Sequence, residues 1–576
     1  MKNKLIILIC SCFIFISCED YFSPTLKGTI PEEDFFSQLN NLRYGLNAVY
    51  NHMQTERYQR GDIIFGEALS DNVWNAQDVE TSDVADILNF TFNTENSYIL
   101  ERYQCNYQGI NKANQVIRSV HKVYYRATGA PEKEIREIYG QAKLLRALFY
   151  FNLVKTFGGV PIRPEEELEL NDLIIPRSSI DEVYAYIEKE LRESLLLLRR
   201  QAYIKGECGQ AGIGAGLGLL MKVLLYQGSP GTQLKETDKE QKLQEALEIG
   251  KYFIAGEDIK LTDLVKFERY AGKESWEDFS ERLFLDKVTM NQNTVFRGQD
   301  IVNLHAMDNF DNLFRVSGEF STESLLEINH YDYSGTGVSI DEGWKCSGYY
   351  TGNWMTPTKA LAELFKNDPR QIFVMMINNV YNDYFTQEES APFGNFNGTG
   401  DQNVFTKYYV FPSEGGAQAR NYRIMRYTEV LLIWAEILNE TGNTPQAVDV
   451  LNRVRERARK LFTGENGKYI TKANILPINF KNVDYAPYDI IRERILEEKR
   501  REMAGDGDRW FEINRLGITS VTMKSLYTAA LQTPEGNSNI PRIRGKYFKK
   551  GVNEIFPIPQ KEVFISNGVI KQNFGY

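Results

Sequence analysis

Helical periodicity in the first half of the chain constrains its fold more than any other sequence feature. Across residues 134–156, apolar side chains recur every three or four positions, which places them on one face of a helix. Phe157-Gly158-Gly159-Val160-Pro161 predicts the end of this helix, because glycine accepts left-handed geometry and proline blocks continuation. We expect further helices at 180–198, 212–226 and 241–255. Such helices predict stacked helical hairpins, although no clean 34-residue repeat is present.

The rest of the chain alternates between loop-rich and helical composition. Residues 261–418 are rich in Gly, Asn, Tyr and Trp, and they show one short helical stretch at 358–366. Helical patterns resume at 424–440, at 446–461 after Pro445, and at 489–503. We therefore divide the chain into a signal peptide (1–17), a lipidated cysteine and tether (18–39), a helical region (40–260), a loop-rich lobe (261–420), a C-terminal helical region (421–520) and C-terminal loops and tail (521–576).

The N-terminus has the features of an export signal. Basic residues in Met1–Lys4 precede an apolar run at 5–16, which is too short to span about 30 Å of hydrocarbon as a stable helix. The following Phe15-Ile16-Ser17-Cys18 looks like a lipobox, in which Cys18 is acylated and becomes the mature N-terminus. The alternative is ordinary signal cleavage with an incidental cysteine. An acyl chain would be the membrane attachment.

Charge and cysteine content exclude some functions. The net charge of −10 argues against a nucleic-acid partner, which would need a concentrated basic face. Once the signal and the acylated cysteine are set aside, Cys105, Cys208 and Cys346 remain, and their wide spacing gives neither a disulfide framework nor a metal motif. One bridge is possible, but buried thiols are expected.

Four segments carry a resemblance to the SusD/RagB family of Bacteroidota nutrient-uptake lipoproteins. They are 140–151 with 157–161; 426–436 with 451–455; 494–516, containing Glu498-Lys499-Arg500-Arg501-Glu502 and Gly505-Asp506-Gly507-Asp508-Arg509-Trp510; and Phe556-Pro557-Ile558-Pro559 with Gln572-Asn573-Phe574-Gly575-Tyr576. Two positions depart mildly from the family pattern, which usually has Glu at Asp506 and Pro at Phe574.

The resemblance implies a fold and a role. The fold would be mainly α, a tetratricopeptide-like helical hairpin scaffold with an irregular loop-rich ligand-binding lobe. The protein would be lipid-anchored in the outer membrane and face the cell exterior. There it would capture oligosaccharide, or in some members peptide, and pass it to a SusC-like TonB-dependent transporter. Glu19 and Asp20 resemble the acidic surface-export signal that follows the lipidated cysteine. No cofactor is expected.

The run 494–516 is interpreted as structural. Arg494 with Glu498, and Glu497 with Arg501, are four residues apart, so each pair would share a helix face and contribute a few tenths of a kcal/mol. Gly505 is expected to end the helix, and the next element, from Trp510 to Ile513, is expected to pack inward.

Ligand binding is expected among aromatic side chains with polar neighbours. A Trp or Tyr ring can cover the apolar face of a sugar, while Asn, Asp or Arg hydrogen-bonds its hydroxyl groups. Two segments, 70–78 and 331–354, combine both, and each aromatic could instead serve packing. The candidate ligand-binding residues are Trp74, Asn75, Asp78, Tyr331, Trp344, Tyr349, Tyr350 and Trp354.

Catalytic and metal-binding motifs are absent from the sequence. The four His are far apart without HExxH or CxxC, and no GxSxG nucleophile elbow occurs. Asp506-Gly507-Asp508 hints at a calcium turn but lacks the other loop ligands. A non-catalytic glycan-binding protein is therefore the leading interpretation. The alternatives are a peptide-binding member of the family, a surface glycosidase using two carboxylates, and a helical-repeat adaptor that binds a protein.

Overall fold

The computed structural model describes most of the chain after the first 34 residues. The described residues are 35–74, 83–126, 132–166, 172–201, 209–232, 234–285, 290–308, 310–314, 318–330, 355–365, 368–376, 404–405, 407, 421–460, 482–532 and 544–576.

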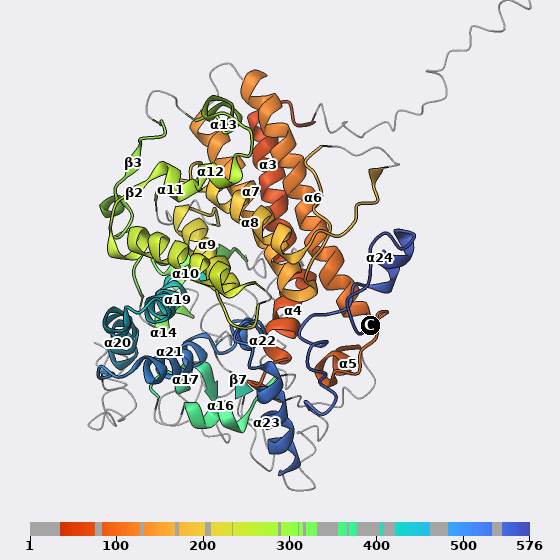
Figure 1. Ribbon diagram of the computed structural model, residues 1–576, viewed down its shortest axis with the longest axis vertical. Helices are drawn as coiled ribbons and strands as arrows, with labels where there is room; N and C mark the ends of the chain where they lie inside the picture. Colours follow the sequence, from red (N-terminus) through yellow and green to blue (C-terminus); the bar gives the residue numbers. More distant parts are fainter. Residues whose placement is uncertain are drawn as a thin grey trace, which may run out of the picture.

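The N-terminal half is a series of helices that pack on their neighbours in sequence. Helix α6 packs on α7, α7 on α8, α8 on α9 and α9 on α10, which gives the expected helical hairpins (Figure 1). The elements are α3 (Leu39–Gln54), α4 (Glu56–Asp62), the π-helix η2 (Ile63–Ala68), α5 (Asp83–Asn89), α6 (Ser97–Arg126), α7 (Glu132–Phe157), α8 (Ile180–Ser194), α9 (Ile213–Gln227), α10 (Glu236–Gly250) and the π-helix η4 (Lys251–Ala255).

Helix α7 lies at the centre of this half. Every residue from Ile138 to Phe157 except Lys155 is buried, so the helix is enclosed on all sides rather than along one stripe. It ends where the sequence predicts, because Gly158 adopts a left-handed φ of 72°. Helix α8 begins with a capping box between Ser179 and Glu182, but it stops at Ser194, four residues before the predicted end.

The glycine-rich helix α9 forms as predicted because its glycines let other elements approach closely. A Cβ on Gly214 would lie 2.2 Å from Nε2 of His305, and one on Gly218 would lie 2.8 Å from the sulfur of Met425. All fifteen residues of α9 are buried. Because these glycines have no side chain, the two halves of the chain can pack closely along this helix.

The middle of the chain holds more helix than the sequence predicts. Thr358 caps the expected helix, α16 (Lys359–Leu364), by accepting a hydrogen bond from the amide of Leu361. The expectation of a single helix in this region was wrong, because helices this short leave no periodic signal in the sequence. The additional elements are α11 (Leu261–Val265), α12 (Phe267–Tyr270), α13 (Trp276–Arg282), the 3-10 helix η5 (Gly298–Asp300), α14 (Phe310–Leu313) and α17 (Gln371–Val374).

Strands in the described part of the chain form four two-stranded antiparallel ladders, so the fold is mainly α. The ladders join segments far apart in sequence: β1 (Val73–Trp74) with β5 (Thr356–Pro357), β2 (Ile259–Lys260) with β3 (Val295–Phe296), β4 (Ser324–Ile328) with β8 (Tyr422–Arg426), and β6 (Met375–Met376) with β7 (Val404–Phe405).

Helix α19 packs on α9 and α10, and α20 and α21 pack on α19 (Figure 1). The helix predicted from residue 424 begins at Tyr427, because residues up to Arg426 pair with β4 instead. Pro445 lies in the first turn of α20, where its missing amide hydrogen costs nothing. The elements are α19 (Tyr427–Glu440), α20 (Thr444–Lys460), α21 (Tyr488–Met503), α22 (Arg509–Arg515), α23 (Thr519–Leu531) and α24 (Gln560–Ile565).

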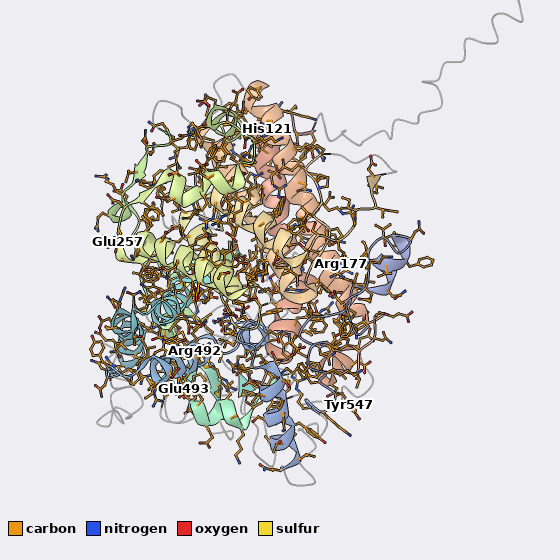
Figure 2. The ribbon with its side chains drawn as sticks, in the orientation of Figure 1. His121, Arg177, Glu257, Arg492, Glu493 and Tyr547 are labelled. Carbon is orange, nitrogen blue, oxygen red and sulfur yellow. The ribbon has the colours of Figure 1, made fainter. Side chains whose placement is uncertain are left out.

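One continuous hydrophobic cluster, from Phe36 to Ile570, joins the two halves. Phe36 is buried, so the predicted tether is already packed before residue 39. Arg177, labelled in Figure 2, holds the C-terminal segment, because its guanidinium donates to the carbonyls of Gly159 and Lys571. None of the described helices combines the length and the hydrophobicity that a membrane-spanning segment requires. The division at 260, 420 and 520 stays a prediction.

Candidate functional site

A short ladder pairs the first predicted ligand-binding segment with residues just beyond the end of the second. Trp74, in the first segment, pairs with Thr356, two residues beyond the end of the second, and Val73 pairs with Pro357. Two stretches of chain about 280 residues apart in sequence therefore meet at one place in the fold. The Trp74 side chain is 5% exposed, so its ring packs in the core and its role in ligand binding stays a prediction.

The other candidates lie outside the described residues. These are Cys18, Asn75, Asp78, Tyr331, Trp344, Tyr349, Tyr350 and Trp354. The described residues next to them define where the candidate segments leave the scaffold. Before residue 331, the His330 amide donates to Oδ1 of Asn421 at 2.7 Å, and Gln59 is hydrogen-bonded to the His330 ring.

The base of the ladder is a fixed set of charges and amides. Oδ1 of Asp71 accepts from Arg509 at 2.8 Å, and its other oxygen lies 3.0 Å from Arg500, which also donates to the side chain of Asn72. Burial opposes ionisation of Asp71, but Arg509 and Arg500 outweigh it and lower its pKa well below the usual value. The hydroxyl of Thr358 donates to the Asp71 carbonyl at 2.9 Å and so ties β5 to the same turn.

Glu67 connects this turn to the family-specific run. Its carboxylate accepts from the side chain of Asn72 at 2.9 Å and from the amides of Gly505 at 3.0 Å and Gly507 at 3.3 Å. Burial raises the pKa of Glu67 to about 7, and the three donors oppose the shift. Gly66 packs directly on the same loop, since a Cβ there would lie 1.7 Å from the carbonyl oxygen of Gly507.

The run 494–516 is structural, as expected, but not through surface ion pairs alone. Glu498 is fully buried and pairs with Arg370 at 2.7 Å and Arg455 at 2.9 Å, not with Arg494, which pairs with Glu497. The predicted Arg494–Glu498 pair was therefore wrong. The partners come from segments far away in sequence, so helical spacing could not reveal them.

Glu502 is the centre of this buried network. It pairs with Arg370 at 2.7 Å, with Arg426 at 2.5 Å and with Arg457. Burial raises its pKa, but Arg457, Arg426 and Arg370 together lower it far below the usual value. The inward packing predicted for α22 is confirmed, with Trp510, Phe511 and Ile513 at 0%, 2% and 0% exposure.

The acidic turn after α21 is neutralised by cations of the protein. Asp506 pairs with Lys407 and Arg426, and Asp508 pairs with Lys155 and Lys222. Across the described ranges, no group of three or more His, Cys, Asp or Glu could hold a metal ion. Cys105 is a buried free thiol.

The sequence did not reveal the residues that fix the ladder. Glu67, Asp71, Asn72, Arg500 and Arg509 come from two segments more than 420 residues apart, and each has an unremarkable local pattern. A signal was nevertheless present in the family-specific run, which contains both arginines. The run holds in place the turn at Asp71 and Asn72, at the beginning of the first candidate segment.

Comparison with known proteins agrees with this architecture of helical hairpins and paired loop segments. Residues 292–576 match the family model of the SusD family, and residues 27–211 match a SusD-like model described as starch-binding associating with outer membrane. The chain belongs to the SusD/RagB family.

Individual relatives are distant but cover nearly the whole chain. A SusD-like protein P38 of Formosa agariphila is 24% identical over 520 residues, 88% of this chain and 90% of its own. A SusD homolog from Bacteroides thetaiotaomicron is 19% identical, with a TM-score of 0.69 over 95% of this chain and 98% of its own. Surface glycan-binding protein A of the same organism, in complex with laminarihexaose, is 17% identical, with a TM-score of 0.59 over 93% of this chain and 99% of its own. These structures establish the fold.

Proposed function

We propose that this protein is an outer-membrane surface lipoprotein that binds oligosaccharide and leaves it chemically unchanged. The observation that carries the proposal is family membership, which includes a match to a model described as starch-binding associating with outer membrane. A glycan-binding protein with the same fold, in complex with laminarihexaose, supports the same ligand class.

The ligand site is formed by the two segments that the β1–β5 ladder joins. Asn75 follows Trp74 directly, Asp78 lies four residues beyond it, and Trp354 lies two residues before β5, so the ladder adjoins both segments along the chain. Tyr331, Trp344, Tyr349 and Tyr350 supply further rings for the apolar faces of sugars. The buried charges below the ladder hold its base rigid, which reduces the ordering cost of binding.

Attachment and transfer follow from the N-terminus and the family. Cys18 carries the acyl anchor, and Glu19 and Asp20 direct the protein to the cell exterior. The captured oligosaccharide passes to a SusC-like TonB-dependent transporter in the same membrane. Reversible, non-catalytic binding suits this role, because cargo must be released intact.

Calorimetric titration tests ligand binding. The mature chain is titrated with hexasaccharides of laminarin, starch, cellulose, xylan and mannan, and with a panel of peptides. We expect saturable binding of at least one hexasaccharide, weakened tenfold or more in Trp344→Ala/Trp354→Ala. Tyr485→Ala is the control, because that ring is 66% exposed and belongs to neither segment. Binding of peptides alone would show that the ligand class is peptide. Absence of binding to every oligosaccharide and every peptide would contradict the proposal.

A further inference from the structure

A groove along α6 lies apart from the β1–β5 ladder. Its volume is about 840 Å³, inside the range of about 300–1,000 Å³ that small-molecule sites occupy. Helix α6 forms the floor from Tyr103 to Arg118, residues 163–166 and 173–175 form one wall, and α24 forms the other. Figure 1 shows α24 beside α6.

Amide side chains line the floor at helical spacing. Gln104, Gln108, Asn111 and Gln115 recur every three or four residues and share one face of α6. Gln108 and Asn111 are exposed, and neither side chain hydrogen-bonds another described residue. Each amide offers both donors and an acceptor, the combination that adjacent hydroxyl groups of a sugar require.

The rest of the groove is held in place by its own hydrogen bonds. The Tyr107 hydroxyl donates to the Pro161 carbonyl at 2.7 Å, which fixes the position of a ring in the lining. Gln104 donates to Glu562 on α24 at 2.9 Å, which links the floor to one wall. The groove is therefore largely formed before any ligand arrives.

Charge and apolar surface indicate the ligand class. The ionised lining residues, Arg118, Arg163, Glu166 and Glu562, have no net charge together, and both arginines donate to backbone carbonyls. Leu173 and Ile565 leave 44% and 57% of their surface exposed at the walls. Neutral amides between apolar walls match a neutral ligand with hydroxyl edges and C–H faces.

We propose that this groove is a second oligosaccharide-binding site. Gln108 and Asn111 hydrogen-bond the hydroxyl groups, and Tyr107 contacts a ring face. The inference rests on the proposed function and deepens it, because two sites on one protein raise the avidity for a long polymer without a new contact at either site.

The double variant Gln108→Ala/Asn111→Ala tests the second site. Its control is Gln241→Ala/Gln244→Ala, since these two glutamines are also exposed and three residues apart, but lie on α10 outside the groove. Calorimetry with the tightest-binding hexasaccharide of the panel is expected to give two binding events in the native protein and in the control. The groove variant is expected to show one binding event and the same melting temperature as the native protein.

Other outcomes separate the two proposals. A single event that Trp344→Ala/Trp354→Ala abolishes and the groove variant leaves intact would overturn the second site alone. A groove variant that loses affinity only for peptides would overturn its assignment to oligosaccharide. Absence of any binding by the native protein would contradict the proposed function and the second site together.

Discussion

Glu67 shows how a single buried carboxyl group can link the candidate ligand site to the family-specific run. It has no exposed surface and accepts hydrogen bonds from Asn72, Gly505 and Gly507. Because burial raises its pKa to about 7, the folded protein keeps a proton that the unfolded chain loses above its ordinary pKa of 4.5. Its contribution to stability is therefore full below pH 4.5 and falls as the pH rises to about 7.

Glu67→Gln tests this titration. In the native protein, the Glu67 contribution is expected to decrease by about 3 kcal/mol between pH 4.5 and 7, since one pKa unit corresponds to about 1.4 kcal/mol. Urea unfolding at several pH values, with the variant as reference, measures the difference. A constant difference in unfolding free energy across this range would show that Glu67 does not titrate there.

Glu502→Gln tests the buried charge network. Removing this charge leaves Arg370, Arg426 and Arg457 without their shared partner, and we expect a loss of about 3–5 kcal/mol in unfolding free energy. Glu493→Gln, on the same helix and labelled in Figure 2, is the control because Glu493 is exposed; it should change stability by less than about 0.5 kcal/mol. Equal effects of the two variants would argue against the network.

Individual residues were predictable from the sequence when local spacing determined their surroundings. Trp510 and its neighbours were correctly expected to pack inward, because an apolar group follows a helix-ending glycine. Glu498 was placed wrongly, because Arg370 is 128 residues away and no local pattern identifies it. Trp74 was identified as the single Trp of a candidate segment, but its pairing with β5 had no signal in the sequence.

At the scale of elements, close backbone contact joins η2 to the turn after α21. Gly66 permits it, because a Cβ would lie 1.7 Å from a backbone oxygen of Gly507. Gly507 itself has a left-handed φ of 82°. The contact between η2, which carries Glu67, and the loop that binds Glu67 therefore depends on two glycines, one for space and one for conformation.

Gly66→Ala is expected to separate these elements. We predict a loss of more than about 3 kcal/mol in unfolding free energy, because a backbone atom cannot rotate away as a side chain can. Gly442→Ala is the control, with a φ of 82° but no atom within 4 Å of the added Cβ, and should lose about 1–2 kcal/mol through backbone strain alone. Thermal unfolding compares the two. A smaller effect at Gly66 than at Gly442 would refute the close contact.

Long helices were predictable, whereas strands and, apart from α16, short helices were not. The helix predicted at 134–156 is α7 (Glu132–Phe157), and that predicted at 489–503 is α21 (Tyr488–Met503), because many turns give a clear period. The start of α19 was misplaced, since the apolar Ile424 and Met425 lie just before the helix but belong to β8. Two-residue strands such as β1 depend on a distant partner and have no period of their own.

At the scale of the whole molecule, the proposed function assigns separate tasks to the helical scaffold and to the lipid anchor. The scaffold holds the ladder and the α6 groove, while we propose that an acyl chain on Cys18 attaches the protein to the membrane. Cys18→Ser is expected to abolish incorporation of radiolabelled palmitate and to release the protein from the membrane fraction. A variant that remains labelled and membrane-bound would show that the anchor lies elsewhere.

Equilibrium dialysis followed by mass analysis of the sugar tests reversible, non-catalytic capture most directly. The mature protein is placed opposite the tightest-binding hexasaccharide of the panel, and the sugar from both chambers is then sized. The account predicts an excess of hexasaccharide in the protein chamber, recovered at its original length and released on dilution. Equal concentrations in both chambers, or shorter products, would contradict it.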